Sequence, residues 1–294
     1  MAKHATTDEL ISCPPADEME DLWSRHSAAW RDTAQITSQW QDAQTIDADL
    51  LKHKVIGDFW EVLASLQITL LIGREYEHLL MAASAQYEPS LSYMPMPHPS
   101  GIAVDRAKGM VHVASTRNPN QIFDLMPMNA CTERRDVIVD PPGDRPLVPV
   151  RSRFLPGCLY MHDLALVGGQ LYANAVGHNA VVRLHDDGSY ERVWWPKCIE
   201  GETGPEFGQN FIQLNSIAAD ERTGKIENCF FSASSEKMSS RRPGHKNYPV
   251  DQKGVIFSGK TREPIARGLT RPHSARLQSD AREPGGKPRL WVDN

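Results

Sequence analysis

Internal repetition is the feature that most constrains the fold of this 294-residue chain. The segment IAVDRAKGMVHVAST, from Ile102, has the same plan as IAADERTGKIENCFFSAS, from Ile217. Each contains a short apolar strand, a turn that runs from Asp to Gly, and a second apolar strand. LALVGGQLYANAV from Leu164 lies between them, and HSARL from His273 begins a further copy. Copies recur about every 50 to 60 residues, which is the length expected for the blades of a β-propeller.

Each repeat is predicted to contain four strands. In the clearest copy, VVRLHDDG leads through a turn at Gly188 into SYERVWWP. An earlier, less regular unit contains ITLLIGRE, EHLLMAASAQ and SLSYMPM. We therefore predict an all-β fold, a β-propeller with four-stranded blades, at residues 55–294. The blades are expected near 57–96, 98–150, 155–198 and 211–269, with a partial blade at 271–294.

The propeller is expected to be incomplete. An unclosed array of sheets leaves apolar blade faces uncovered and edge strands unpaired. The chain ends in LWVDN, an alternating apolar strand that starts at Leu290. This pattern indicates truncation, with an open solenoid-like array as the alternative.

Residues 1–54 differ from the rest, because apolar residues recur there at helical spacing. Met19, Trp23, Trp30 and Ala34 fall on one face of a helix predicted at about 16–42. Acidic residues in its first turn suit the positive end of the helix dipole. The tryptophan face either packs on the propeller or binds a protein partner.

Charge and motifs exclude several classes of function. With 37 acidic and 32 basic side chains, the net charge of -5 gives no general attraction to nucleic acid or to anionic membranes. The N-terminus is too polar for a secretory signal, and no apolar run is long enough to span a bilayer, so a cytoplasmic protein is expected. Five scattered cysteines favour buried thiols. Nucleotide-binding and common hydrolase motifs are absent from the sequence.

Aligning the repeats predicts a site. In each repeat we compared the residue two positions before the first apolar residue of the first strand. In the four repeats this residue is Ser100, His162, Asn215 and His273, and His98 lies two residues before Ser100. First strands of propeller blades line the central channel, so these side chains are expected to meet near one of its mouths. Asn174 and Asp293, at the ends of second strands, are expected companions. Ligand contacts are therefore predicted at His98, His162, Asn174, Asn215 and His273.

Several functions remain open for these residues. The imidazoles of His162 and His273 can hold a divalent metal, which is the only cofactor considered, or one can act as a general base. Alternatively, each imidazole only satisfies hydrogen bonds of neighbouring loops. The leading hypothesis is a propeller that binds a small ligand or metal at a His-lined channel mouth, with catalysis undecided. The alternative is a non-catalytic module that binds a protein partner.

A basic cluster lies in a long insertion of the Ile217 repeat. It contains Arg241, Arg242, His245 and Lys246. Its default interpretation is a solvated loop, and its functional interpretation is a clamp for an anionic ligand, because arginine pairs offer bidentate donors to carboxylate or phosphate.

Longer segments carry a resemblance to known families. HPSGIAVD resembles the blade openings of six-bladed propellers of the NHL-repeat and gluconolactonase-like families. ASTRNPNQ, RPLVPVRSRFLPGCLYMHDLALVGGQLYANAVG, QLNSIAAD, RRPGHKNYPVDQKGVIFSG and GLTRPHSARL together resemble a bacterial family of conserved hypothetical proteins of unknown function. The resemblance covers most of the chain from about Phe59 and implies that the propeller continues beyond LWVDN. It implies no particular activity.

Overall fold

A computed structural model describes most of the chain beyond the N-terminal segment. The described residues are 43, 46–116, 120–127, 147–157, 159–208, 210, 212–220, 223–238, 251–278 and 288–293. The helix predicted at 16–42 and the basic cluster at Arg241 lie outside them. None of the described helices is long and apolar enough to cross a membrane.

The described part of the chain is mostly β and forms successive antiparallel sheets. The first sheet has three strands, which are β1 (Thr69–Arg74), β2 (Leu79–Ser84) and β3 (Ser90–Pro95). Three four-stranded sheets follow. They contain β4 (Pro99–Asp105), β5 (Met110–Ser115), β6 (Asn120–Pro127) and β7 (Leu147–Leu155); β8 (Met161–Val167), β9 (Gln170–Ala175), β10 (Ala180–Leu184) and β11 (Tyr190–Trp194); and β14 (Leu214–Ala218), β15 (Phe230–Ala233), β16 (Gly254–Ser258) and β17 (Pro264–Leu269). A two-stranded sheet of β18 (Ala275–Gln278) and β19 (Arg289–Val292) completes the series.

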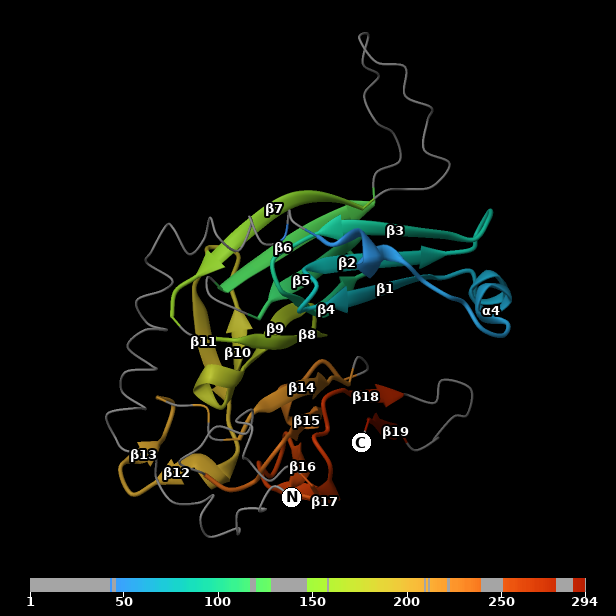
Figure 1. The fold of residues 1–294 in the computed structure, drawn as a ribbon. Helices are drawn as coiled ribbons and strands as arrows, with labels where there is room; N and C mark the ends of the chain where they lie inside the picture. The colour runs from blue at the N-terminus through green and yellow to red at the C-terminus, as the bar shows by residue number, and fades with distance from the viewer. Residues whose placement is uncertain are drawn as a thin grey trace, which may run out of the picture.

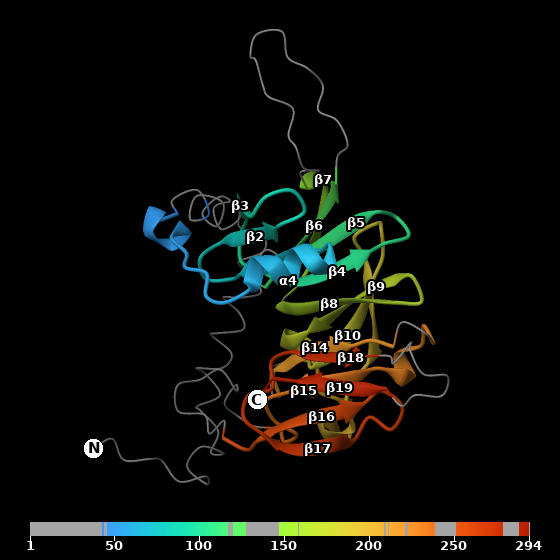
Figure 2. The same ribbon diagram turned by 90° about the vertical axis from the view of Figure 1, so that its right-hand side faces the viewer.

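The sheets are arranged as the blades of a β-propeller, which confirms the predicted fold class. In each of these sheets, strands consecutive in sequence pair as antiparallel neighbours. The sheets follow one another from β1–β3 to β18–β19, as Figures 1 and 2 show. A small hairpin of β12 (Glu200–Gly201) and β13 (Gly204–Pro205) lies between two blades in sequence. The short 3-10 helices lie in connecting segments, at η1 (Ala48–Leu51), η2 (Val176–His178), η3 (Lys197–Ile199) and η4 (Ile226–Asn228).

A short helix, which the sequence analysis did not predict, directly precedes the first sheet. Helix α4 (Phe59–Leu66) ends at Gln67, whose φ of 51° is left-handed. Its buried Leu63 packs with Ala83 and Ala85, which lie at the end of β2. The helix thus covers one end of the first sheet.

The core is divided among the interfaces between successive sheets. Between the third and fourth blades, the ring centroid of Trp194 lies 4.0 Å from that of Phe231, and the indole Nε1 donates to the carbonyl oxygen of Gly259 at 2.9 Å. Trp195 is only half-buried and packs edge-on against Phe207. Trp194 therefore belongs to the core, and Trp195 packs at the edge of the same cluster.

Inner strands of neighbouring blades approach each other closely. A Cβ atom on Gly101 of β4 would lie 2.5 Å from the backbone nitrogen of Leu164 in β8, so no other residue fits there without a shift of the backbone. On the other side of β4, a Cβ atom on Gly73 would lie 3.0 Å from the carbonyl oxygen of Pro99, so the end of β1 meets the start of β4. These contacts bring the inner strands together around a common centre.

Candidate functional site

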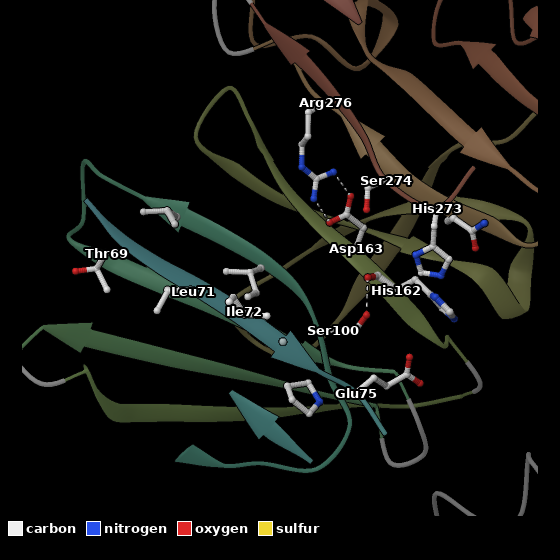
Figure 3. Close-up of a pocket in the computed structure, with 15 residues that line it drawn as sticks. Thr69, Leu71, Ile72, Glu75, Ser100, His162, Asp163, His273, Ser274 and Arg276 are labelled. Atoms are coloured by element: carbon white, nitrogen blue, oxygen red, sulfur yellow. Dashed lines mark hydrogen bonds and ion pairs between the residues drawn. The ribbon is translucent and has the colours of Figure 1, made fainter. Parts of the chain in front are cut away.

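A cavity of about 610 Å³ lies among the inner strands of the propeller. Its lining residues come from β1, β4, β8 and β14, from the segment before β18, and from β18 itself. One part of the lining is apolar and contains Leu71, Ile72, Ile102 and Val104. The other part is polar, and Figure 3 shows several of its side chains.

The four positions aligned in the sequence meet in this cavity. Ser100, His162, Asn215 and His273 all line it. The ring centroids of His162 and His273 are 5.5 Å apart. Ser100 Oγ donates to the backbone oxygen of His162 at 2.8 Å, which joins β4 to β8. The alignment of the repeats therefore identified residues that are neighbours in the structure.

A repeated backbone conformation brings these side chains together. The residue two positions before each of them has a positive φ: His98 at 40°, Tyr160 at 51°, Gln213 at 48° and Arg271 at 49°. A left-handed conformation of a non-glycine residue costs about 1 to 3 kcal/mol, and such residues concentrate at functional sites. Their recurrence at four blade entries indicates a local geometry that the fold maintains.

Irregular pairing follows the left-handed residue in three of the blades. The register between first and second strands shifts between Pro99 and Ile102, between Met161 and Leu164, and between Leu214 and Ser216. A β-bulge changes the direction of the side chains within it. Ser100, His162 and Asn215 lie at these shifts, which explains why they reach the same cavity.

His98 and Asn174 do not line the cavity, unlike the other predicted ligand contacts. His98 is itself a left-handed residue, and its ring packs on that of His78 with centroids 4.2 Å apart. Asn174 is fully buried, accepts a hydrogen bond from Asp163 N at 2.5 Å, and donates to Leu214 O at 2.7 Å. It joins β9 to β14.

Asp293 has a similar structural contact in the last sheet. Its Oδ1 accepts hydrogen bonds from the backbone nitrogens of His273, at 2.7 Å, and Ser274, at 2.6 Å. The second-strand residues thus fix the backbone that presents the cavity side chains.

Sequence analysis missed an ion pair at the cavity, in which the carboxylate of Asp163 is buried and Arg276 is half-exposed. Both nitrogens of the Arg276 guanidinium end donate to Asp163, from Nη1 to Oδ2 at 2.7 Å and from Nη2 to Oδ1 at 3.0 Å. Asp163 also accepts from the backbone nitrogens of Leu164 and Ile217, each at 3.0 Å. Burial raises the pKa of the Asp163 carboxyl, and Arg276 acts in the opposite direction. The pair joins β8 to β18 across β14.

Asn215 presents an acceptor that none of the described protein groups satisfies. Its Nδ2 donates to Ser234 Oγ at 3.3 Å and to Pro272 O at 3.0 Å. Its Oδ1 is buried and accepts no hydrogen bond from the residues that the structure describes. An unsatisfied buried acceptor costs about 1 to 3 kcal/mol, so this oxygen favours a bound donor from outside the chain.

The described residues give limited support for a metal. No group of three or more His, Cys, Asp or Glu side chains among them is placed to hold a metal ion. His162 and His273 supply two nitrogens, whereas protein zinc sites ordinarily have three or four protein ligands.

Comparison with solved structures returns matches of low sequence identity. A protein of unknown function from Bacteroides caccae is 8% identical, with a TM-score of 0.42, over 70% of this chain and 62% of that chain. An aldose sugar dehydrogenase from Streptomyces coelicolor, in its PQQ-bound form, is 14% identical, with a TM-score of 0.37, over 76% of this chain and 78% of that chain. A streptogramin B lyase is 13% identical, with a TM-score of 0.39, over 76% of this chain and 75% of that chain.

The chain spans less than two thirds of the Bacteroides caccae protein. No curated protein matches the sequence. A family described as a domain of unknown function, DUF4915, matches residues 57–283. Because this match covers most of the sequence, the chain belongs to the DUF4915 family.

Proposed function

We propose that this propeller binds a small organic molecule in the cavity among its inner strands. The observation that carries the proposal is the meeting of His162, Asn215 and His273, from three different parts of the chain, in one cavity that also has apolar lining residues. Its volume of about 610 Å³ lies within the range of small-molecule sites, which combine apolar linings with a few polar groups that fix orientation.

Each polar group has a distinct part in this proposal. The imidazoles of His162 and His273 hydrogen-bond the ligand, and Asn215 Oδ1 accepts from a ligand N–H or O–H group. An imidazole titrates near neutral pH and is also able to take a proton from a bound molecule. Binding is the proposed function, and turnover of the ligand is a separate outcome of the same experiment.

The test is a screen of metabolite-sized compounds by ligand-induced thermal stabilisation. The wild type is compared with His162→Ala and His273→Ala, and with His53→Ala as a control, because His53 is exposed and outside the cavity. A ligand at 100 times its Kd stabilises the native state by about 2.7 kcal/mol. We expect this stabilisation in the wild type and the control, and its loss in both cavity variants.

The same variants distinguish a purely structural histidine. If His162 only satisfies a hydrogen bond, His162→Ala lowers the free energy of unfolding by about 1 to 3 kcal/mol and leaves the ligand-induced shift unchanged. That result would contradict the proposal. Parallel thermal melts with added Zn²⁺ and with a chelator test the metal alternative. If the melting temperature rises only with Zn²⁺, the cavity binds a metal and the proposal of an organic ligand is wrong. If neither an organic compound nor Zn²⁺ stabilises the protein in a manner that depends on His162, the alternative function, binding of a protein partner, is favoured.

A further inference from the structure

The ion pair with Asp163 uses only part of the Arg276 guanidinium. A guanidinium carries five N–H donors in a fixed plane. Nη1 and Nη2 donate to Asp163, and Nη1 also donates to the carbonyl oxygen of Ala275 at 2.8 Å. The remaining donors are Nε–H and the second hydrogen of Nη2, which lie side by side on another edge of the plane. Nε donates to none of the residues that the structure describes.

Asp163 fixes the plane of the guanidinium from its buried side. The Asp163 side chain is 6% exposed, and its carboxylate accepts two backbone hydrogen bonds, from Leu164 and Ile217, in addition to those from Arg276. Because four donors satisfy this carboxylate, it does not need the remaining N–H groups of the arginine. The Arg276 side chain lines the cavity and is 56% exposed, so its Nε–Nη2 edge is accessible to a ligand.

This edge matches a carboxylate. Two parallel N–H donors of a guanidinium bind the two oxygens of a carboxylate or of a phosphate in a bidentate pair. A phosphate monoester brings nearly two negative charges at neutral pH, whereas a carboxylate brings one. Since Asp163 already compensates the charge of Arg276, the singly charged group is favoured.

The other acidic side chain of the lining lies apart from this edge. Glu75 accepts a hydrogen bond from Thr116 Oγ1 at 2.6 Å. In Figure 3, Arg276 and Glu75 lie on either side of His162 and His273. A carboxylate bound at Arg276 therefore approaches Asp163, whose charge is compensated, and stays away from Glu75.

The rest of the lining suits an apolar body attached to the carboxylate. Its apolar side chains are Leu71, Ile72, Ile102 and Val104. Each methylene group that a ligand removes from water tightens its binding about fourfold. The cavity volume of about 610 Å³ leaves room for several such groups beside the carboxylate.

We propose that the ligand is a carboxylic acid with an apolar chain or ring. Its carboxylate binds the Nε–Nη2 edge of Arg276, and its apolar body contacts the apolar residues of the lining. This inference rests on the proposed function, because it assigns a chemical class to the ligand of the same cavity.

The test measures the affinity of simple carboxylates for the whole chain by calorimetry at neutral pH. The probes are butanoate, octanoate and 3-phenylpropanoate, the primary amides of the last two, and octyl phosphate. We expect octanoate or 3-phenylpropanoate to bind, and octanoate to bind more tightly than butanoate by about fourfold for each methylene that becomes buried. The amide of the same acid loses the charge-assisted pair and should bind roughly tenfold to hundredfold more weakly.

One variant connects the carboxylate to Arg276. Arg276→Lys keeps the charge but removes the planar pair of donors, so the carboxylate should bind roughly tenfold more weakly. On this variant the difference between acid and amide should decrease by the same factor, because both changes remove the same interaction. Arg267→Lys is the matched control, because Arg267 lies on β17 and forms a bidentate pair with Glu236 outside the cavity.

The outcomes separate this inference from the proposed function. The carboxylic acid assignment is wrong, and the proposed function stands, if other compounds bind in a manner that depends on His162 while no carboxylate binds. The same conclusion follows if acid and amide bind within about twofold of each other, or if octyl phosphate binds more tightly than octanoate. If no compound binds in that manner, both proposals are wrong. The comparison of acid and amide on the wild type remains decisive even if Arg276→Lys fails to fold.

Discussion

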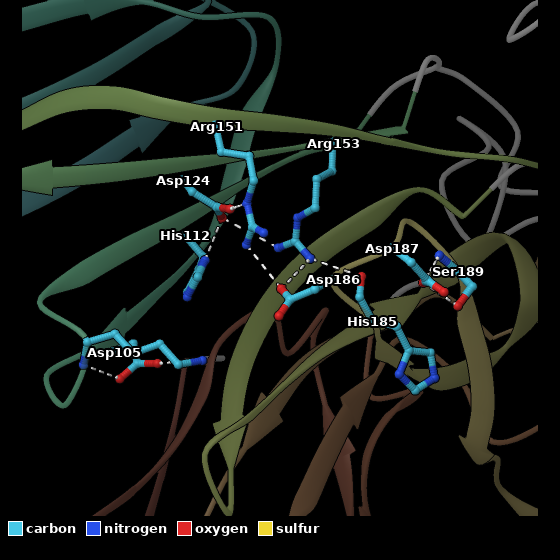
Figure 4. A network of polar contacts seen from close by, with 10 residues as sticks. Asp105, His112, Asp124, Arg151, Arg153, His185, Asp186, Asp187 and Ser189 are labelled. Carbon is cyan, nitrogen blue, oxygen red and sulfur yellow. Dashed lines mark hydrogen bonds and ion pairs between the residues drawn. The ribbon is translucent and has the colours of Figure 1, made fainter.

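Asp124 and Asp163 are both buried and both pair with arginine, but their surroundings differ. Asp124 in β6 lies 2.6 Å from His112 Nδ1, accepts from Arg151 Nε at 2.6 Å, and lies 3.4 Å from Arg153 Nη2 (Figure 4). All these partners belong to one sheet. Asp163 instead contacts groups of three different inner strands, and its arginine partner faces the cavity.

The two environments move the two carboxyl pKa values in opposite directions. Burial alone would raise the pKa of Asp124, but His112, Arg151 and Arg153 outweigh burial and lower it. Burial raises the pKa of Asp163, because a single half-exposed arginine compensates less well. The Asp124 cluster has the features of a structural clamp, and the Asp163 pair has those of a ligand-facing group.

The clamp also joins two blades. Arg151 and Arg153 extend from β7 to the turn between β10 and β11, where Arg151 Nη2 lies 3.1 Å from Asp186 Oδ1 and Arg153 Nη1 donates to His185 O at 3.1 Å. Polar contacts therefore connect the second blade to the third at a distance from the cavity.

The largest expected effect is that of Asp124→Asn. Breaking a buried ion pair by removing one charge costs about 3 to 5 kcal/mol, and here two arginines lose their carboxylate. We expect the free energy of unfolding in urea to fall by that amount while the affinity of the folded protein for a cavity ligand is unchanged. A loss of stability below about 1 kcal/mol, the value of a typical surface pair, would contradict the clamp.

Asp163→Asn should have an intermediate effect, about 1 to 3 kcal/mol, because the amide keeps one acceptor for the backbone donors. Its pH dependence should be opposite to that of Asp124→Asn. Stability from ionised Asp124 is complete above the ordinary pKa of 3.8 and is lost as the pH falls through the lowered pKa of the folded state. Asp163 has a raised pKa, so its contribution declines as the pH rises from 3.8 through the raised value.

Urea titrations near pH 4.5 and pH 7 measure this difference in sign. The cost of Asp163→Asn should be larger at the lower pH, whereas the cost of Asp124→Asn should not increase there. If Asp163→Asn lowers the free energy of unfolding equally at both pH values, Arg276 fully compensates for the effect of burial on the Asp163 carboxyl.

The smallest expected effect is that of Asp186→Asn. The Asp186 side chain is 80% exposed, so its pairs with Arg151 and Arg153 are screened by water and salt. We expect a change of about 0 to 1 kcal/mol, which decreases further in high salt. If Asp186→Asn lowers the free energy of unfolding as much as Asp124→Asn does, the contacts between the two blades, and not the buried carboxylate, supply most of the stability of the clamp.

The repeats predicted the sheets because turn residues and strand spacing are local signals. Gly168 and Gly169 form the hairpin between β8 and β9 with φ values of 58° and 75°, a backbone conformation that glycine adopts without steric cost. Helix α4 was missed because it has only eight residues and buries only Leu63. A helix this short carries little periodic signal.

The site was predicted in part, for physical reasons that differ among residues. His162, Asn215 and His273 follow from the alignment because equivalent positions start equivalent strands. His98 was expected on the same strand face as Ser100, but its left-handed backbone interrupts the alternation of side chains. The pair of Asp163 and Arg276 spans 113 residues, so no local pattern indicates it.

The left-handed residues at the four blade entries have a consequence for protein engineering. His98, Tyr160, Gln213 and Arg271 differ in chemistry but share one backbone conformation, and the side chains two positions later are Ser, His, Asn and His. The scaffold therefore directs whichever side chain stands at these positions toward the cavity. Ser100→His is expected to add a third imidazole beside His162 and His273, which would supply the three nitrogens of a zinc site with one open position and convert the cavity into a designed metal centre.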